Sequence, residues 1–263
     1  LENDLRKAVE NRQEFTLQYQ PIFSLVTGTI SGFEALLRWQ HPQRGQLLPA
    51  EFIALAEDTG LIVPLGRWVL AQAALQMRIW QLAFPTAQPL IVSVNISPKQ
   101  FLHPGLVQQI DKILWETGLN GRSLKLEITE STLIDDSEET ALMLQQLRQR
   151  QIGLCIDDFG TGYSSLSHLT RFPLSTLKID RSFVNQIGKQ GQNAAILWTI
   201  VNLAHNLSMD VIAEGVETAI QLQQLKKLKC EQVQGNYLSP PVDANAAGLL
   251  LAAGRKQQME YRH

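Results

Sequence analysis

The stretch LQYQPIFSLVTGTISGFEALLR, residues 17–38, decides the fold of this chain. Two apolar runs within it, Leu17–Phe23 and Ile30–Arg38, are typical of β-strands. The short segment between them, Ser24–Thr29, centres on Thr27-Gly28 and indicates a hairpin turn. Because this connection leaves no room for a crossover helix, the first strand is expected to run antiparallel to its neighbour.

From Leu90 onward, strand-like and helix-like segments alternate, which predicts a parallel sheet covered by helices. The further strands are expected at Leu90–Val94, Leu124–Ile128, Ile152–Ile156, Thr176–Ile179, Asp210–Ala213 and Glu231–Val233. Helices are expected between them, over about 105–117, 137–150, 193–206 and 218–228. Together with the hairpin the strands number about eight, which is the number that closes a (β/α) barrel. We therefore predict an α/β fold with a closed barrel.

The length of 263 residues, with 44% hydrophobic and 18% charged content, suits a globular chain with a substantial core. Residues 1–16 are expected to form a helical lead-in and residues 17–255 the barrel domain. The net charge of -2 offers no basic field for a nucleic-acid backbone, so DNA is not expected as a partner. The two cysteines, Cys155 and Cys230, form neither a disulfide framework nor a thiolate metal motif, and a reducing cytoplasm is expected.

The apolar stretches are too short and too interrupted to span a bilayer, so this domain is expected to be soluble and to make no membrane contact of its own. The sequence begins at Leu1 without a start methionine. It is therefore expected to be part of a longer polypeptide that carries upstream regulatory domains and that could be tethered to a membrane.

Oxygen-bearing side chains follow or interrupt several apolar runs: Glu34, Asn95, Glu127, Asp157, Asp158 and Glu214. In a barrel of this type, the strand ends lie on one rim, so these side chains are expected to form a ring around a single mouth. One carboxylate alone would more often cap a helix. Helix capping does not explain Glu34 or Glu127, which sit inside apolar runs, and buried carboxylates require a shared centre of positive charge.

The proposed ligands are all carboxylate or amide oxygens, a donor set that selects Mg²⁺ or Mn²⁺ over Zn²⁺. The adjacent pair Asp157-Asp158 indicates that one aspartate bridges two metals while the other reaches the second metal or its water. Two such metals stabilise the attacking and leaving oxygens of a displacement at phosphorus, which predicts phosphodiester hydrolysis.

Three further residues have alternative interpretations. Lys178 lies in a strand that faces the core and should point at the carboxylates or at a water, the alternative being a lysine that snorkels to solvent. Arg38 suits a phosphate oxygen as well as a surface salt bridge. Glu130 either caps a helix or braces the glycine-rich loop that follows Asp157-Asp158.

The motifs, taken in order, resemble the signature set of the EAL family of cyclic di-GMP phosphodiesterases over about Tyr19 to Pro241. They are Glu34-Ala35-Leu36-Leu37-Arg38, Asn95-Ile96-Ser97, Glu127-Ile128-Thr129-Glu130, Asp157-Asp158-Phe159-Gly160-Thr161-Gly162, Lys178-Ile179-Asp180 and Glu214-Gly215-Val216-Glu217. One departure is Val233-Gln234-Gly235-Asn236-Tyr237, where many relatives differ on both sides of Gln234-Gly235.

The resemblance implies a modified TIM barrel with an antiparallel first strand, which hydrolyses cyclic di-GMP to linear pGpG with Mg²⁺ or Mn²⁺, two per site. It implies the metal ligands Glu34, Asn95, Glu127, Asp157, Asp158 and Glu214, and catalytic roles for Glu34, Lys178 and Glu214. It also implies substrate contacts or support from Gln20, Leu36, Arg38, Asp180, Glu217 and Gln234, and a loop-stabilising role for Glu130. A homodimer formed around the glycine-rich loop is implied as well.

Two other functions are open at this point. The same pocket would serve a receptor that binds cyclic di-GMP without cleaving it. A different barrel enzyme, in which carboxylate-bound magnesium stabilises an enediolate, would bind no nucleotide and would leave Gln20 and Arg38 unexplained.

Overall fold

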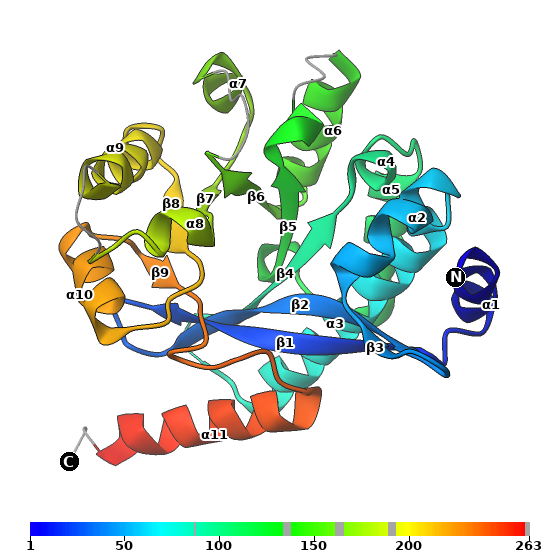
Figure 1. The fold of residues 1–263 in the computed structure, drawn as a ribbon, viewed down its shortest axis with the longest axis horizontal. Coiled ribbons are helices and arrows are strands. Elements are labelled where there is room, and N and C mark those ends of the chain that lie inside the picture. The colour runs from blue at the N-terminus through cyan, green and yellow to red at the C-terminus, as the bar shows by residue number, and fades with distance from the viewer. Residues whose placement is uncertain (87, 134–137, 161–165, 189–192, 261–263) are drawn as a thin grey trace.

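The computed structural model describes residues 1–86, 88–133, 138–160, 166–188 and 193–260, and in it one sheet closes on itself. Its strands are β1 (Phe15–Ser24), β2 (Ile30–His41), β3 (Gly45–Leu47), β4 (Ile91–Ile96), β5 (Leu124–Thr129), β6 (Gly153–Phe159), β7 (Thr176–Ile179), β8 (Asp210–Ala213) and β9 (Gln232–Val233). The ring runs β1-β9-β8-β7-β6-β5-β4-β2 and back to β1, while β3 extends from β2 outside the ring. The predicted α/β barrel is confirmed (Figure 1).

Strand β1 is antiparallel to both of its neighbours in the ring, β2 and β9. The turn after β1 is closed by hydrogen bonds from the Ser24 amide to Thr29 O and from the Gly28 amide to Ser24 O. Gly28 has a φ of 70°, a conformation that glycine adopts without a steric penalty. The antiparallel first strand predicted from this hairpin is therefore confirmed, and its register sets Gln20 opposite Glu34.

The other strands of the ring are parallel to one another from β2 through β4, β5, β6, β7 and β8 to β9. Their registers keep the carboxyl ends level, since Asn95 pairs with Glu127 and Thr129 with Asp157. The polar residues at these ends consequently face one mouth of the barrel.

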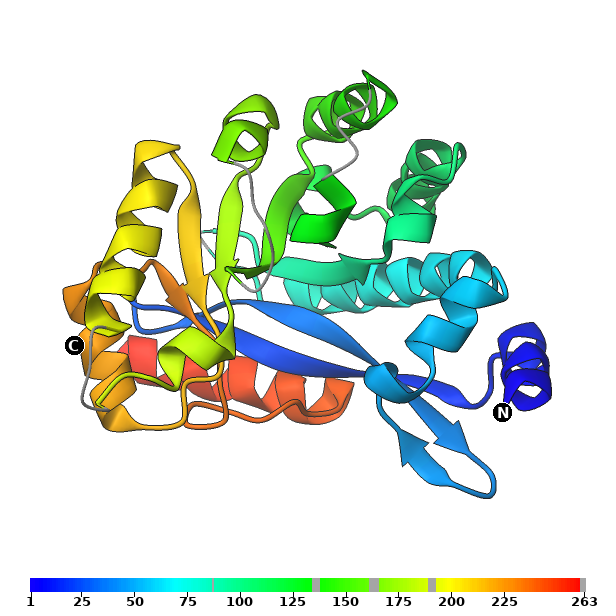
Figure 2. The ribbon, with the colours of Figure 1, turned by 45° about the horizontal axis from the view of Figure 1, so that its top comes forward.

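Helices surround the ring on its outside (Figure 2). They are α1 (Glu2–Asn11), α2 (Ile53–Asp58), α3 (Ile62–Ala83), α4 (Pro98–Phe101), α5 (Leu106–Thr117), α6 (Glu138–Gln149), α7 (Leu166–Arg171), α8 (Arg181–Val184), α9 (Asn193–Asn206), α10 (Ala219–Lys227) and α11 (Ala244–Glu260), with 3-10 turns η1 (Pro49–Glu51), η2 (Gly121–Ser123) and η3 (Glu130–Leu133). Helices α2 and α3 lie between the second and third predicted strands, a region for which no helix is predicted above.

Helix α3 covers the hairpin side of the barrel and carries much of the core there. Trp80 packs against Tyr19 of β1 and Phe33 of β2, with ring centroids 4.8 and 4.7 Å apart. Gly248 of α11 lies against Trp80 and Phe84, so α11 and α3 meet beneath the first two strands. This packing seals the place where the antiparallel strand closes the ring.

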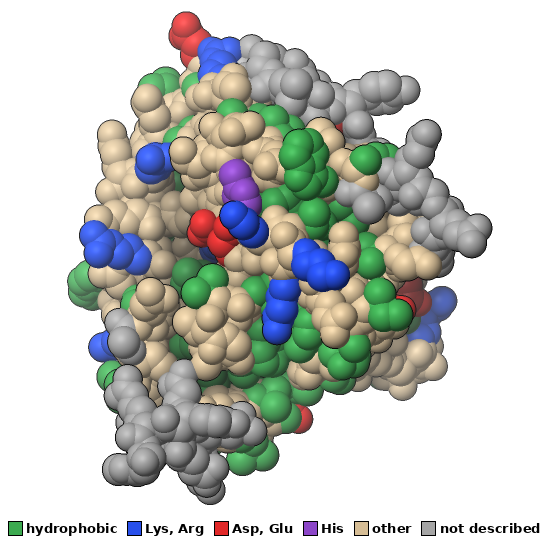
Figure 3. All heavy atoms as spheres, turned by 90° about the vertical axis from the view of Figure 1, so that its left-hand side faces the viewer, with side chains coloured by type: hydrophobic (Ala, Val, Ile, Leu, Met, Phe, Trp, Pro, Cys, Tyr) green, Lys and Arg blue, Asp and Glu red, His purple; other side chains and the backbone are tan. Residues whose placement is uncertain are grey.

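The outer face formed by α9 and α10 carries exposed apolar side chains, among them Ile196, Trp198 and Ile220, between basic groups (Figure 3).

Among the residues described, none of the helices combines the length and apolar character that crossing a lipid bilayer requires.

Candidate active site

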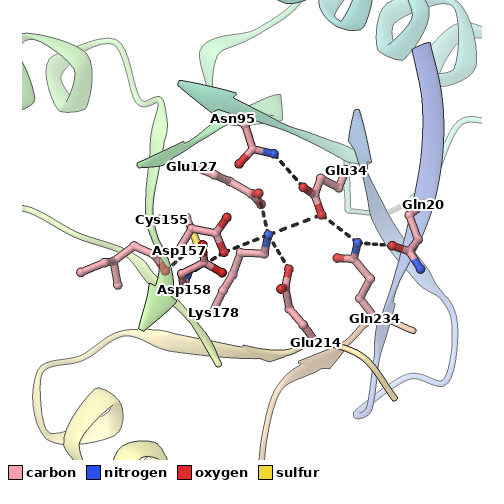
Figure 4. Close-up of polar contacts among 11 residues, drawn as sticks. Gln20, Glu34, Asn95, Glu127, Cys155, Asp157, Asp158, Lys178, Glu214 and Gln234 are labelled. Carbon is pink, nitrogen blue, oxygen red and sulfur yellow. Dashed lines mark hydrogen bonds and ion pairs between the residues drawn. The ribbon is translucent and has the colours of Figure 1, made fainter. Parts of the chain in front are cut away.

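The ammonium group of Lys178 lies at the centre of the barrel mouth and is ringed by carboxylates (Figure 4). Its Nζ atom is 2.5 Å from Glu214 Oε1, 2.7 Å from Glu127 Oε2, 3.3 Å from Asp157 Oδ1 and 3.4 Å from Glu34 Oε2. The side chain is only 1% exposed. Lys178 therefore points at the carboxylates, as predicted, and does not snorkel to solvent.

The charge of Lys178 is stabilised by this ring. Burial by itself would lower the pKa of the amine, but the negative charges of Glu127, Glu214, Glu34 and Asp157 outweigh burial and raise the pKa well above its usual value. Within this ring of carboxylates, the Lys178 amine is therefore protonated and donates hydrogen bonds.

Glu34 is held by amides on both of its oxygens. Asn95 Nδ2 donates to Oε1 at 2.7 Å, and Gln234 Nε2 donates to Oε2 at 2.8 Å. Gln234 Nε2 also donates to Gln20 Oε1 at 2.8 Å, which ties β9 to β1 across the antiparallel seam. Although burial opposes ionisation, Lys178 and these amides lower the pKa of Glu34 overall, so this carboxylate is ionised.

Two other carboxylates bind protons more tightly than in water. Burial raises the pKa of Glu127 well above its usual value, despite the attraction of Lys178. Burial likewise raises the pKa of Glu214 to about 7, with the negative charges of Glu34 and Asp157 adding to the effect. The carboxylates around Lys178 therefore differ in proton affinity, with Glu34 ionised and Glu127 and Glu214 binding protons more readily.

An irregularity in β6 brings two consecutive aspartates to the same place. The pairing of β6 with β7 shifts register between Ile156 and Phe159, and Asp158 has a left-handed φ of 54°. In a regular strand, Asp157 and Asp158 would point to opposite faces. Here, carboxylate oxygens of Asp157, Asp158 and Glu214 all lie within 4.8 Å of one another.

This acidic group fits a divalent cation. A buried oxygen, Glu127 Oε1, has no hydrogen-bond partner, although a buried carboxylate oxygen normally has one. Burial, together with the charge of Asp157, also raises the pKa of Asp158. A hard cation would satisfy oxygen donors of this kind, and no histidine or cysteine ligand stands among the three clustered carboxylates.

A cavity of about 830 Å³ opens beside the acidic group. The predicted substrate residues that line it are Gln20, Leu36, Asp180, Glu217 and Gln234. Its opposite wall is apolar and comes from η1, α2, α3 and α4, with Pro49, Ile53, Ile62, Leu65, Val69 and Pro98. The sequence does not predict this wall, because Ile62, Leu65 and Val69 have the spacing of an ordinary core-facing helix.

Two predicted site residues, Arg38 and Glu130, do not line the cavity. Arg38 is buried, donating from Nε to Gln18 Oε1 and from its NH1 group to Leu37 O, both at 2.8 Å, and it is not among the residues lining the cavity. Its alternative reading as a surface salt bridge is wrong. Glu130 begins η3 with both carboxylate oxygens buried, and neither oxygen accepts a helix-capping hydrogen bond from the residues that the structure describes. Residues 161–165, which it was predicted to brace, lie outside the described residues, as does most of the predicted dimer region.

The sequence is similar to that of known signalling proteins. The bifunctional diguanylate cyclase/cyclic di-GMP phosphodiesterase MucR of Pseudomonas aeruginosa is 45% identical over 242 residues, covering 92% of this chain and 35% of that protein. The cyclic di-GMP phosphodiesterase NbdA of the same organism is 41% identical over 255 residues, covering 97% and 32%. This chain thus spans about a third of the length of these curated relatives.

Solved structures share the fold. The PaMucR phosphodiesterase in complex with c-di-GMP matches with a TM-score of 0.87 at 44% identity, covering 93% of this chain and 98% of that one. The EAL enzyme Bd1971, in a form bound to cAMP and cyclic-di-GMP, matches with a TM-score of 0.91 at 38% identity, covering 95% and 68%. The family model described as "EAL domain" matches residues 2–241. The chain belongs to the EAL domain family.

Proposed function

We propose that this domain hydrolyses one phosphodiester bond of cyclic di-GMP and releases linear pGpG. The observation that carries the proposal is the ring of carboxylates around Lys178, which opens into a cavity large enough for a small dinucleotide. The relatives named as cyclic di-GMP phosphodiesterases support the same substrate.

Divalent cations, Mg²⁺ or Mn²⁺, are the proposed cofactors, and two per site match the local charge. Four carboxylates pair with the Lys178 ammonium and Asp158 lies beside two of them, so the five acids and one ammonium leave four negative charges when every group is ionised. Asp157, Asp158 and Glu214 would hold one cation, with Glu34, Asn95 and Glu127 completing the set. When bound, the cations would lower the pKa of a water molecule and neutralise charge on the phosphate.

Side chains of the domain itself are proposed to orient the water, accept its proton and contact the nucleotide. Lys178 donates hydrogen bonds to the attacking water or to a phosphate oxygen. Glu214, which lines the cavity beside Lys178, is the proposed acceptor of that proton. Gln234 and Asn95 hold Glu34 in place, while Gln20, Leu36, Asp180 and Glu217 offer contacts to the nucleotide.

The receptor alternative uses the same cavity but leaves the substrate intact. The test is to incubate the domain with cyclic di-GMP and Mn²⁺ and to follow pGpG by chromatography. We expect pGpG from the unaltered domain and none from Glu34→Gln, whose fold is checked by circular dichroism. Binding without pGpG would establish the receptor, whereas an absence of any binding would favour the enediolate class of enzyme.

A further inference from the structure

Helix α8 packs against a glycine of the β6 end. Gly160, two residues after Asp158, has a φ of 95°, and a Cβ atom placed on it would lie 2.7 Å from Cε2 and Cζ of Phe183. Such a distance is shorter than carbon atoms tolerate, so the Phe183 ring occupies the space that a side chain at residue 160 would need. A side chain at residue 160 would therefore have to displace this half-buried ring or move the end of β6 away from α8.

The same short helix packs against a second glycine on the β8 end. Gly215, directly after Glu214, has a φ of 67°, and a Cβ atom there would lie 2.5 Å from Cβ of Arg181. The Glu214 amide also donates to Ile179 O, just before α8 begins. Helix α8 thus touches the chain next to Asp158 on one side and next to Glu214 on the other.

Helix α8 is itself anchored at both ends. Asp180 caps its first turn by accepting a hydrogen bond from the Ser182 amide at 2.9 Å. At its other end, Val184 O accepts a hydrogen bond from Gln221 Nε2 at 3.3 Å, and Gln221 Oε1 accepts one from the Glu217 amide at 2.7 Å. Gln221 is buried, so it fixes α8 to the loop that carries Glu214.

We propose that α8 is a spacer that sets the separation between Asp157-Asp158 and Glu214, with Phe183 and Arg181 as positioning residues for the divalent cation. The inference rests on the proposed function, since it takes these carboxylates as cation ligands. Metal–oxygen distances hold within a few tenths of an ångström, so a methyl group added at either glycine should spread the ligands and weaken binding.

The test measures Mn²⁺ affinity from the electron paramagnetic resonance signal of free Mn²⁺, alongside thermal stability and turnover. Gly160→Ala and Gly215→Ala are compared with Gly28→Ala, whose φ of 70° is close to the 67° of Gly215 but whose Cβ would meet nothing within 4 Å. We expect the first two to bind Mn²⁺ about tenfold or more weakly, in the range seen when support around metal ligands is lost. Gly28→Ala should bind like the unaltered domain.

A double variant separates the spacer contact from strain at Gly160. Phe183→Leu removes the ring atoms that crowd residue 160, so Gly160→Ala with Phe183→Leu should bind Mn²⁺ no more weakly than Phe183→Leu alone. Saturating Mn²⁺ should restore kcat in Gly215→Ala.

The spacer would be overturned if Gly160→Ala and Gly215→Ala bound Mn²⁺ as tightly as Gly28→Ala. It would also be overturned if the double variant bound Mn²⁺ more weakly than Phe183→Leu alone. If Gly160→Ala does not fold, an unchanged Mn²⁺ affinity in Gly215→Ala would overturn the spacer equally. Absence of Mn²⁺ binding by the unaltered domain would instead overturn the proposed function, and the spacer with it.

Discussion

Lys178 shows how a single residue organises a site of otherwise repelling groups. Its ammonium lies within 3.4 Å of four carboxylates, three from β2, β5 and β6 and one from the residue that follows β8. Each of those acids is costly to bury, and the lysine offsets part of that cost for all of them at once. The geometry explains why the strand containing Lys178 tolerates a charge that faces the barrel interior.

Replacing this lysine should destabilise the domain more than an ordinary surface change would. Lys178→Met leaves the carboxylates without their cation, so we expect the unfolding free energy at pH 8 to fall by roughly 3–5 kcal/mol, the usual cost of breaking a buried ion pair. Urea denaturation of the metal-free protein measures the loss. Lys7→Met, on the exposed face of α1, is the control and should change little.

Glu214 makes the stability of the metal-free domain depend on pH. Its pKa of about 7 when folded exceeds the ordinary 4.5, so the folded state holds a proton that the unfolded state releases. Stability from this group is therefore complete below pH 4.5 and is lost as pH rises to about 7. From the shift, the loss is on the order of 3 kcal/mol. Burial of Glu127 acts in the same direction.

Urea denaturation with a chelator present, at pH 5 and pH 8, checks this slope. Glu214→Gln should flatten it, because the amide does not titrate. An equal slope in that variant would show that other groups cause the dependence.

At the scale of elements, the irregularity in β6 changes the alternation of side chains that a regular strand would impose. It turns two neighbouring aspartates toward one mouth, at the cost of a left-handed conformation at Asp158. Asparagine and aspartate adopt that conformation more readily than other residues with side chains, and branched residues adopt it poorly.

Substitutions at Asp158 should therefore separate charge from conformation. We expect Asp158→Asn to lose most turnover and Mn²⁺ affinity while keeping its stability, because the backbone is undisturbed. Asp158→Val should lose turnover as well and also about 1–2 kcal/mol of stability from backbone strain. Kinetic assays and thermal unfolding compare the two, and equal stabilities would contradict the strain argument.

The sequence was sufficient for some of these elements and not for others. The hairpin and its antiparallel first strand follow from local turn chemistry and strand length, and the strand pairing confirms them. The amide contacts of Gln234 and the burial of Arg38 depend on side chains far apart in sequence, so no local pattern predicts them. The apolar cavity wall was missed for a related reason, since a helix facing a cavity and one facing a core have the same periodicity.

At the scale of the whole molecule, the closed ring brings ligands from distant parts of the chain to one point. We expect metal removal by a chelator to abolish turnover without unfolding the domain, and added Mn²⁺ to raise the unfolding temperature. At a concentration one hundred times its dissociation constant, a bound ion stabilises by about 2.7 kcal/mol. The gain should be larger at pH 8 than at pH 5.5, because protons on the carboxylates compete with the ion. Potassium chloride at the same ionic strength is the control and should give no comparable shift.

Because Lys178 already supplies a positive charge among the acids, the barrel can fold before any metal ion binds. Newly made chains would reach their final shape on protein chemistry alone and receive their ions afterwards. The supply of metal ions would then control when the folded domain is active, and would not control whether the domain folds.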